Sequence, residues 1–159
     1  MNNIAWMLRR FHVFPVPGRG RYRVQPVFVD DVASLAVSLA GGNHGTTTDA
    51  AGPEEFTFAG FIKVLGWSMG VHTLVLPTPT KASLAAGAVL SRVLGDVAIT
   101  DEELGALVAE TLVSSGPATA PTKLTDWLKA HASELGRRYT SELARHWESR
   151  PKAPSGPTE

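Results

Sequence analysis

The chain has 159 residues, of which 43% are apolar, and its 15 basic and 15 acidic side chains give a net charge of zero. This length corresponds to about one domain with enough apolar content for a core, and the neutral balance gives no general electrostatic attraction to nucleic acid. The sequence holds no cysteine, which excludes disulfides and thiolate chemistry and leaves the redox compartment open.

The first predicted elements are a helix over residues 4–11 and an extended segment over 13–16. Asn2 or Asn3 can cap the helix, because their side-chain oxygens accept from free backbone N–H groups at a helix start. The prolines that follow end the helix and favour extended backbone. A turn at 18–20 then leads to a strand over 24–29, so that the extended segment and this strand are expected to form a hairpin.

The apolar run at 24–29 continues directly into a predicted helix over 32–40, with Asp30 or Asp31 as its cap. A short strand is expected at 46–50. Thr57 is expected to cap a helix over 58–65, with Phe56 and Phe61 at the spacing of a hydrophobic staple. The remaining expectations for this part are a loop at 41–45, a turn at 52–53, helix-breaking glycines at 66 and 70, and a strand at 73–76.

The second half of the sequence reads as helical. Thr80 is expected to cap a helix over 81–94 that ends at Gly95, and a capping box at 100–103 opens a helix to about residue 113. After a linker over 114–121, apolar residues recur mostly every fourth position from 124 to 147, which indicates one helical stripe that Gly136 interrupts. The proline-rich residues 151–159 are expected to be a disordered tail.

Helices interleaved with three or four short strands indicate an α/β fold. A doubly wound sheet needs more strands, so residues 1–150 look like one lobe of a larger unit. The strand at 46–50 would lack a partner and the helix at 31–40 would lack a cover, which predicts a partner or poor solubility. Residues 4–8 are too short for a signal segment, and residues 83–99 are interrupted by charges, so we expect a cytoplasmic protein without a membrane span.

Several patterns that could carry chemistry have simpler interpretations. Residues 66–70 match G-x-S-x-G around Ser68, but a nucleophile elbow needs a strand before the serine and a helix after it, and the predicted order is the reverse. Asp30 and Asp31 are adjacent and would face opposite ways, so they cannot act as a carboxylate pair. The five histidines lack metal-ligand spacing, and the four tryptophans are expected in the core or at an interface.

Residues 1–29 contain five arginines and no acidic residue, namely Arg9, Arg10, Arg19, Arg21 and Arg23. One interpretation is a solvated face or a contact with an acidic partner surface. The other is an anion site for a phosphate-bearing ligand, because arginine pairs well with phosphate.

Four stretches share their order and spacing with a known family: residues 3–10 with P-V-P-G-x-G at 15–20, Q-P-V-F-V-D-D-V at 25–32, A-G-P-E-x-F-T at 51–57 and L-P-x-P at 76–79. They resemble the extended and atypical short-chain dehydrogenases. The similarity is nearest to the NAD(P)-binding branch that includes epimerase/dehydratase-like proteins and the NAD(P)H-binding accessory subunit of respiratory complex I. The runs at 124–127 and 135–143 are similar to actinobacterial members, so the resemblance spans about residues 3–147.

The resemblance implies the C-terminal, substrate-side part of a Rossmann-type short-chain dehydrogenase, mostly helical with a few short strands, and without the N-terminal nucleotide-binding βαβ units. It places residues 46–50 as a late strand of the Rossmann sheet. The family's glycine-rich turn is absent, and so is its Tyr-x-x-x-Lys pair, since Pro26 follows Tyr22 and Leu143 follows Tyr139 at the required spacing.

No catalytic, cofactor-binding or metal-binding residue can therefore be carried over, and NAD or NADP is implied only for the full-length family. The resemblance does place Arg23, Gln25 and Phe28 near a small-molecule substrate, with Phe28 standing where related enzymes often have His or Tyr. The implied partner is an N-terminal Rossmann half or an oligomeric partner.

Three hypotheses about function follow. The first is a substrate-side lobe of an NAD(P)-dependent oxidoreductase or epimerase that does not turn over alone. The second is a non-catalytic binding or assembly module of the same fold. The third is a serine hydrolase that uses Ser68.

Overall fold

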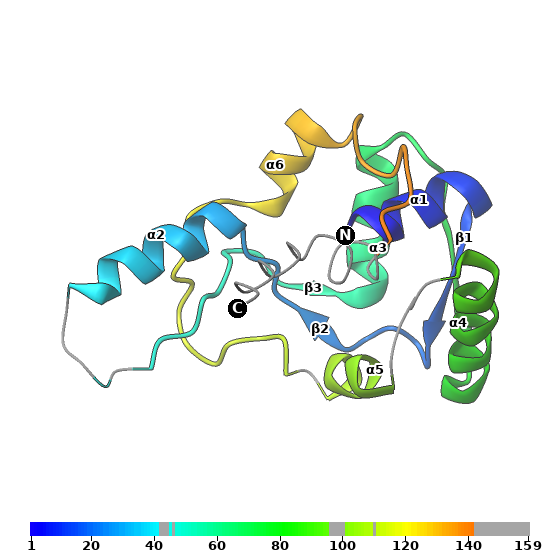
Figure 1. Ribbon diagram of the computed structural model, residues 1–159, viewed down its shortest axis with the longest axis horizontal. Helices are drawn as coiled ribbons and strands as arrows, with labels where there is room; N and C mark the ends of the chain where they lie inside the picture. Colours follow the sequence, from blue (N-terminus) through cyan, green and yellow to red (C-terminus); the bar gives the residue numbers. More distant parts are fainter. Residues whose placement is uncertain (42–44, 46, 96–100, 110, 142–159) are drawn as a thin grey trace, which may run out of the picture.

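A computed structural model describes residues 1–41, 45, 47–95, 101–109 and 111–141 (Figure 1). Its helices are α1 (Asn2–Phe11), α2 (Val29–Ala40), α3 (Phe58–Ser68), α4 (Thr80–Leu94), α5 (Asp101–Val108) and α6 (Leu124–His131). Its strands are β1 (Val13–Pro17), β2 (Arg23–Val24), β3 (Phe56–Thr57) and β4 (Leu74–Thr78). The chain is thus a mixed α/β protein, rich in helix and with short strands, which confirms the coarse fold class.

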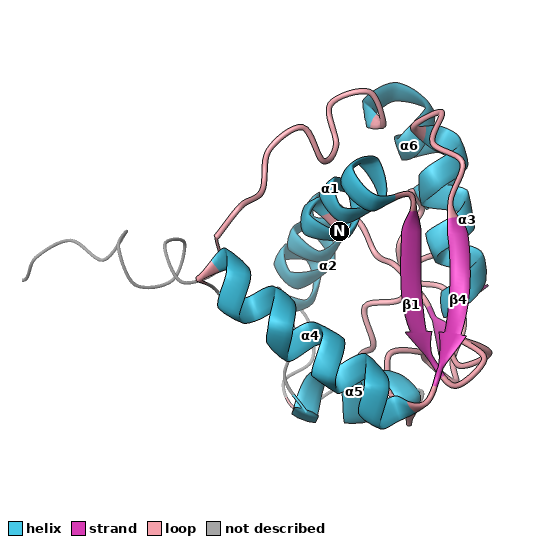
Figure 2. Cartoon of the chain, turned by 90° about the vertical axis from the view of Figure 1, so that its right-hand side faces the viewer, coloured by secondary structure: helices cyan, strands magenta, loops and turns pink. Residues whose placement is uncertain are grey.

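The strands form two separate pairs. β1 and β4 are parallel, with Val13 opposite Leu74, and β2 pairs antiparallel with β3. The expected hairpin is wrong, because β1 pairs with a strand about 60 residues later instead of with the next one. Figure 2 shows β1 and β4 side by side with α3 behind them.

Prolines occupy the outer edges of the β1–β4 pair. The amide of Leu74 donates to the carbonyl of His12, so the even-numbered residues of β4 direct their amides toward β1. Alternation then places Pro77 on the outer edge of β4, and the same argument places Pro15 and Pro17 on the outer edge of β1. Proline has no N–H to donate, so both edges are poor templates for a further strand.

Helix α3 is the centre of the core. Its buried residues recur at helical spacing and meet side chains from α1, β1 and α6; the buried set is Phe58, Phe61, Ile62 and Leu65 with Ala5, Leu8, Val16, Leu124 and Leu128. The predicted cap is confirmed, because Thr57 Oγ1 accepts from the amide of Gly60 at 3.1 Å. The helix continues through Gly66, contrary to expectation, and ends at Ser68 before Gly70 turns the chain with a φ of +69°.

The asparagines at the start of α1 do not cap it. The N-cap is Met1, which makes no side-chain cap bond. The side-chain amides of Asn2 and Asn3 instead bond to a segment more than 130 residues away. Asn2 Nδ2 donates to the carbonyl of Arg138 at 3.0 Å, and Asn3 exchanges two hydrogen bonds with the backbone of Thr140. These side chains therefore join the two ends of the described chain.

Two expected strands are shorter or missing. The run predicted at 24–29 is a strand only at its start, because β2 ends at Val24 and α2 begins at Val29. Residues 47–50 form no strand in the described structure. A strand requires a partner for its backbone groups, and the apolar or β-branched character of a segment cannot supply one.

The second half of the chain largely follows the predicted pattern. α4 ends at the left-handed Gly95 as expected, although its N-cap is Pro79 and Thr80 lies inside it. α5 ends at Val108, short of residue 113, and the linker after it is irregular. Leu124, Leu128 and Ala132 of the stripe are buried, but α6 ends at His131 and the chain turns before Gly136.

Other expectations fall on residues that the structure does not describe. They are Thr100, most of the loop at 41–45, the end of the apolar stripe with Trp147, and the tail with the proposed boundary at 150. Within the described residues, no helix has both the length and the apolar character needed to cross a membrane.

Tyr22 carries a buried polar atom without a partner. Its ring stacks on Phe58 with centroids 5.4 Å apart, and its hydroxyl has no hydrogen-bond partner in the described part of the chain. Burial raises the pKa of Tyr22 to about 12 from its usual 10.0, because the ionised form loses hydration. Folding therefore favours the neutral phenol, so ionisation at high pH works against the folded state.

We expect Tyr22→Phe to be as stable as the wild type or more stable by about 1 kcal/mol near pH 7, because it removes an unsatisfied buried hydroxyl. The advantage should grow as pH rises from about 10 to about 12, since only the unfolded wild type ionises there, at up to about 1.4 kcal/mol per pH unit. Urea unfolding of both proteins near pH 7 and pH 11 measures this. Equal losses of stability by the two proteins between these pH values would contradict it.

Candidate functional site

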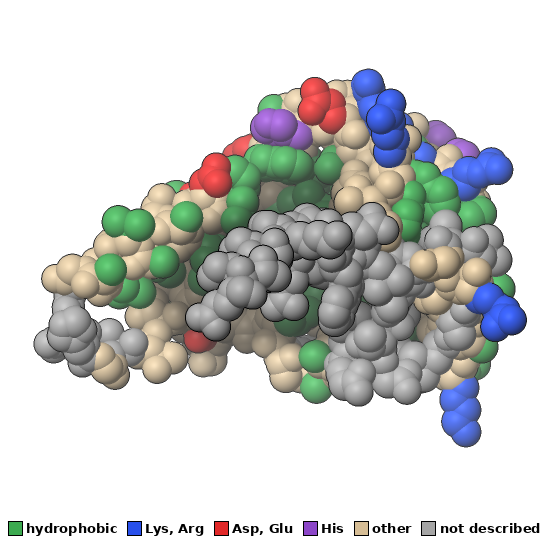
Figure 3. All heavy atoms as spheres, in the orientation of Figure 1, with side chains coloured by type: hydrophobic (Ala, Val, Ile, Leu, Met, Phe, Trp, Pro, Cys, Tyr) green, Lys and Arg blue, Asp and Glu red, His purple; other side chains and the backbone are tan. Residues whose placement is uncertain are grey.

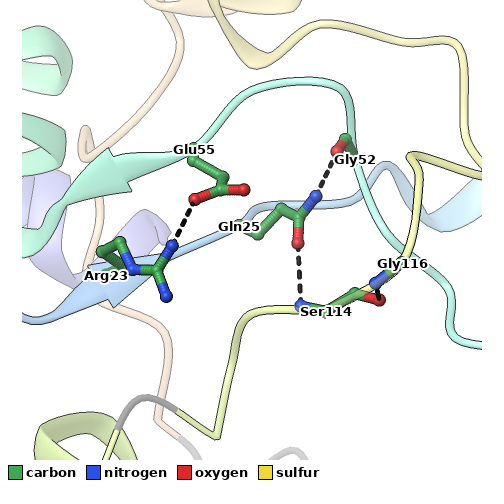
Figure 4. A network of polar contacts seen from close by, with 6 residues as sticks. All are labelled: Arg23, Gln25, Gly52, Glu55, Ser114 and Gly116. Carbon is green, nitrogen blue, oxygen red and sulfur yellow. Dashed lines mark hydrogen bonds and ion pairs between the residues drawn. The ribbon is translucent and has the colours of Figure 1, made fainter.

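The three residues assigned to substrate lie on one short segment that joins β2 to α2. Arg23 belongs to β2, and its Nη1 forms an ion pair with Glu55 Oε2 at 3.0 Å (Figure 4). Both side chains are about half exposed, at 51% and 45%, so the pair adds little stability. Arg23 thus remains accessible to an anionic group, although it is already oriented by a carboxylate.

The amide of Gln25 is committed at both ends to other parts of the chain. Its Nε2 donates to the carbonyl of Gly52 at 2.7 Å, and its Oε1 accepts from the amide of Ser114 at 3.0 Å (Figure 4). Its backbone N–H donates to the carbonyl of Leu112. A substrate contact at Gln25 stays a prediction, and it would require one of the two side-chain bonds to be given up.

Phe28 belongs to a cluster of rings with Trp127 and His131. Its ring lies 6.5 Å from that of Trp127, which stacks on His131 at 4.5 Å and 13°. Phe28 is also the N-cap residue of α2, where its carbonyl accepts from the amide of Val32. The phenyl side chain carries no polar group, so it offers a substrate no hydrogen bond.

The acidic residues near this segment hold α6. Asp31 does not cap α2; it accepts from the amide and the hydroxyl of Thr122 at 2.9 and 3.1 Å. Glu54 likewise accepts from the amide and hydroxyl of Thr125, in the first turn of α6. A carboxylate at a helix N-terminus is favourable, because the helix dipole is positive there. Sequence reasoning missed Glu54, since 71 residues separate it from Thr125 and no local pattern announces the contact.

The arginines of residues 1–29 have separate roles. Arg9 is half-buried and donates to the carbonyls of Leu135 and Ala132, which ties α1 to the chain after α6. Arg23 pairs with Glu55. Arg10, Arg19 and Arg21 are exposed. At least two of the five are therefore occupied by internal contacts, which argues against one shared anion site.

Among the described residues, the remaining candidates lack the arrangement that their chemistry requires. Ser68 is the last residue of α3, β4 follows it, and its hydroxyl donates to the carbonyl of Val64, so the nucleophile-elbow context is absent. No group of three potential metal ligands occurs among the described residues. Trp127 packs against the core as expected, whereas Trp67 is 72% exposed, which excludes it from the core.

The most unusual surface belongs to α2 and residues 47–50. All twelve residues of α2 are described and none is buried, although the helix is rich in Val, Leu and Ala. Figure 3 shows hydrophobic side chains along this helix on the visible face. Residues 47–50 are exposed too. Comparison with known proteins adds no name to this geometry: no family model matches the chain, and a search of curated proteins finds no match.

Proposed function

We propose that this chain is the substrate-side lobe of an NAD(P)-dependent oxidoreductase or epimerase related to the atypical short-chain dehydrogenases. A nucleotide-binding half, in the same polypeptide or in a partner subunit, completes it. The observation that carries the proposal is the surface of α2, which is rich in apolar residues of which none is buried.

An isolated helix of this length is marginal in water, and helices in proteins are stabilised chiefly by the burial of an apolar face. α2 exposes Val29 by 70%, Val37 by 76% and Leu39 by 42%. In an α/β fold a helix of this composition lies against a sheet. The described strands offer α2 no such sheet, so the proposal supplies it from the nucleotide-binding half.

The backbone of residues 47–50 supports the same conclusion. Thr48 and Ala50 form no backbone hydrogen bond within the described residues, and no proline interrupts 47–50. The outer edges of β1 and β4 carry prolines, whereas residues 47–50 carry none. An edge without proline can accept another strand. The segment is therefore the candidate for strand pairing with the other half.

In the completed protein the bound nicotinamide supplies or accepts the hydride. Under this proposal the chain binds and orients the substrate through the segment that carries Arg23, whose half-exposed guanidinium is suited to an anionic or polar substrate group. The sequence carries neither a dinucleotide-binding glycine turn nor a Tyr-x-x-x-Lys pair, so the chain alone has no turnover under this proposal.

One observation favours the second hypothesis, a non-catalytic binding or assembly module with the same fold. The amide of Gln25 is consumed internally, and Phe28 presents an aromatic ring in place of a polar group. The coding sequence before residue 1 discriminates between the two. The enzyme is favoured if that sequence encodes a strand, G-x-x-G-x-x-G, a helix and Tyr-x-x-x-Lys. The module is favoured if it encodes the glycine turn without the tyrosine pair.

Titration of the purified chain with NAD⁺, NADP⁺ and their reduced forms is expected to give no saturation at micromolar concentration. Val37→Asp is expected to raise solubility and leave the melting temperature nearly unchanged, since the side chain is already 76% exposed. Ser38→Asp is the matched control for added charge on the same helix. Micromolar dinucleotide binding by the chain alone would refute the proposal, and equal solubility of the two variants would remove the support from α2.

A further inference from the structure

Residues 112–122, called the strap below, are irregular, with turns and bends in their first half, and pass beside residues 49–52 (Figure 1). Ala51 is bonded to the strap on both its polar groups: its carbonyl accepts from the amides of Thr119 and Ala120 at 2.9 and 3.0 Å, and its amide donates to Thr119 Oγ1. Thr119 Oγ1 also donates to the carbonyl of Asp49 at 2.7 Å. The hydroxyl of Thr119 thus bonds to the backbone of Asp49 and Ala51, as the backbone of a neighbouring strand would in a sheet.

Two further contacts anchor the N-terminal end of the strap. The hydroxyl of Ser114 donates to the carboxylate of Asp49 at 2.6 Å, a charge-assisted bond. Gln25 connects Ser114 to Gly52, as described above. The strap, the 49–52 segment and the chain after β2 are therefore joined through one polar network, to which Figure 4 gives a close view.

This network uses one side of the segment only. The bonds to the strap fall on Asp49 and Ala51, and in extended backbone alternate residues direct their N–H and C=O groups to the same side. Thr48 and Ala50 direct theirs to the other side, where the described residues provide no partner. In the described structure the strap thus closes one edge of the segment, and no described residue pairs with the other edge.

We propose that the strap and Gln25 are a positioning device that closes the Asp49/Ala51 edge and holds the opposite edge, Thr48/Ala50, ready for one strand of the nucleotide-binding half. The inference rests on the proposed function for the identity of that strand. It assigns Gln25 to positioning the interface, in place of a contact with substrate. The device admits a single strand on a defined side, because the strap already occupies the other.

Hydrogen exchange of the whole chain tests the strap directly. The amides of Ser114, Thr119 and Ala51 are expected to exchange slowly, and those of Thr48 and Ala50 rapidly. Thr119→Val keeps the shape of the side chain and removes its hydroxyl, so exchange at Ala51 should rise on the order of tenfold. Amides within α3 should be unaffected.

The control is Thr111→Val, which also removes a threonine hydroxyl bond, from Thr111 Oγ1 to the carbonyl of Ala106, but outside the strap. Gln25→Ala should accelerate exchange at Ser114, whose amide donates to it. Unchanged exchange at Ala51 in Thr119→Val would overturn the strap, and slow exchange at Thr48 and Ala50 in the chain alone would overturn the open edge.

Addition of the nucleotide-binding half, as a separately expressed protein, provides the second arm. Docking should protect Thr48 and Ala50 and should be weaker for Thr119→Val than for Thr111→Val. Docking that protects neither amide would overturn the assigned edge and leave the proposed function standing. Failure of the wild type to dock, with the strap exchanging as expected, would overturn the proposed function instead.

Discussion

Gly52→Ala is expected to lower the free energy of unfolding by about 3 kcal/mol or more, because a methyl group at this position has no room. A Cβ on Gly52 would stand 1.8 Å from the carbonyl oxygen of Pro26, a backbone atom that cannot move aside as the end of a flexible side chain can. Relief requires the two segments to separate, which also breaks the bond from Gln25 to Gly52. The melting temperature should fall by roughly 10 °C.

Gly105→Ala is the matched control for the same chemical change. Gly105 lies within α5, and a Cβ there meets nothing within 4 Å. Alanine is a better helix former than glycine by about 1 kcal/mol, so this variant should be more stable than the wild type. If both alanine variants melted at the wild-type temperature, the close approach of Gly52 to Pro26 would be contradicted.

Gly136→Ala is expected to have an effect of similar size by a different route. Gly136 has a φ of +68°, and its added Cβ would lie 2.4 Å from the carbonyl carbon of Ala5 and 2.5 Å from the amide nitrogen of Trp6. The variant must therefore adopt a left-handed backbone and also displace α1, whose Asn2 Oδ1 accepts from the amide of Gly136. We expect a loss of about 3 kcal/mol or more, with α1 separating from the chain after α6.

Gly70→Ala is the control that separates the cost of a left-handed backbone from the cost of the clash with α1. Gly70 has a nearly identical φ of +69°, but nothing lies within 4 Å of an added Cβ. Its loss should be about 1 kcal/mol, the usual cost of a left-handed backbone for alanine. Denaturant unfolding of both variants measures the difference, which is the cost of the contact with α1. Equal losses would mean that α1 does not pack on Gly136.

The segment over residues 23–28 shows which contacts can be predicted from the sequence. That Arg23, Gln25 and Phe28 lie near one another follows from their adjacency in the chain. Their partners do not follow, because Glu55, Ser114 and Trp127 are brought to them by the fold from 32 to 99 residues away along the chain. Both bonds of Gln25 illustrate this, because they tie a side chain that was expected near a ligand to Gly52 and Ser114.

The sequence by itself determined the local features of this protein. The start of α3 at its Thr57 cap, the end of α4 at Gly95, and the buried stripe of α6 all depend on residues within a few positions of each other. Periodicity and capping act through contacts between near neighbours in the chain, so these elements could be read without a structure.

Only the tertiary structure decided the pairing of β1 with β4, the absence of a strand at 47–50, and the use of Asp31 and Glu54 to hold α6. Each depends on which distant backbone or side chain comes within hydrogen-bonding distance. The residues 47–50 resemble a strand in sequence, but the strap satisfies one side of the neighbouring backbone and the other side has no described partner. Strand pairing and carboxylate contacts are properties of two segments together, and neither segment encodes its partner.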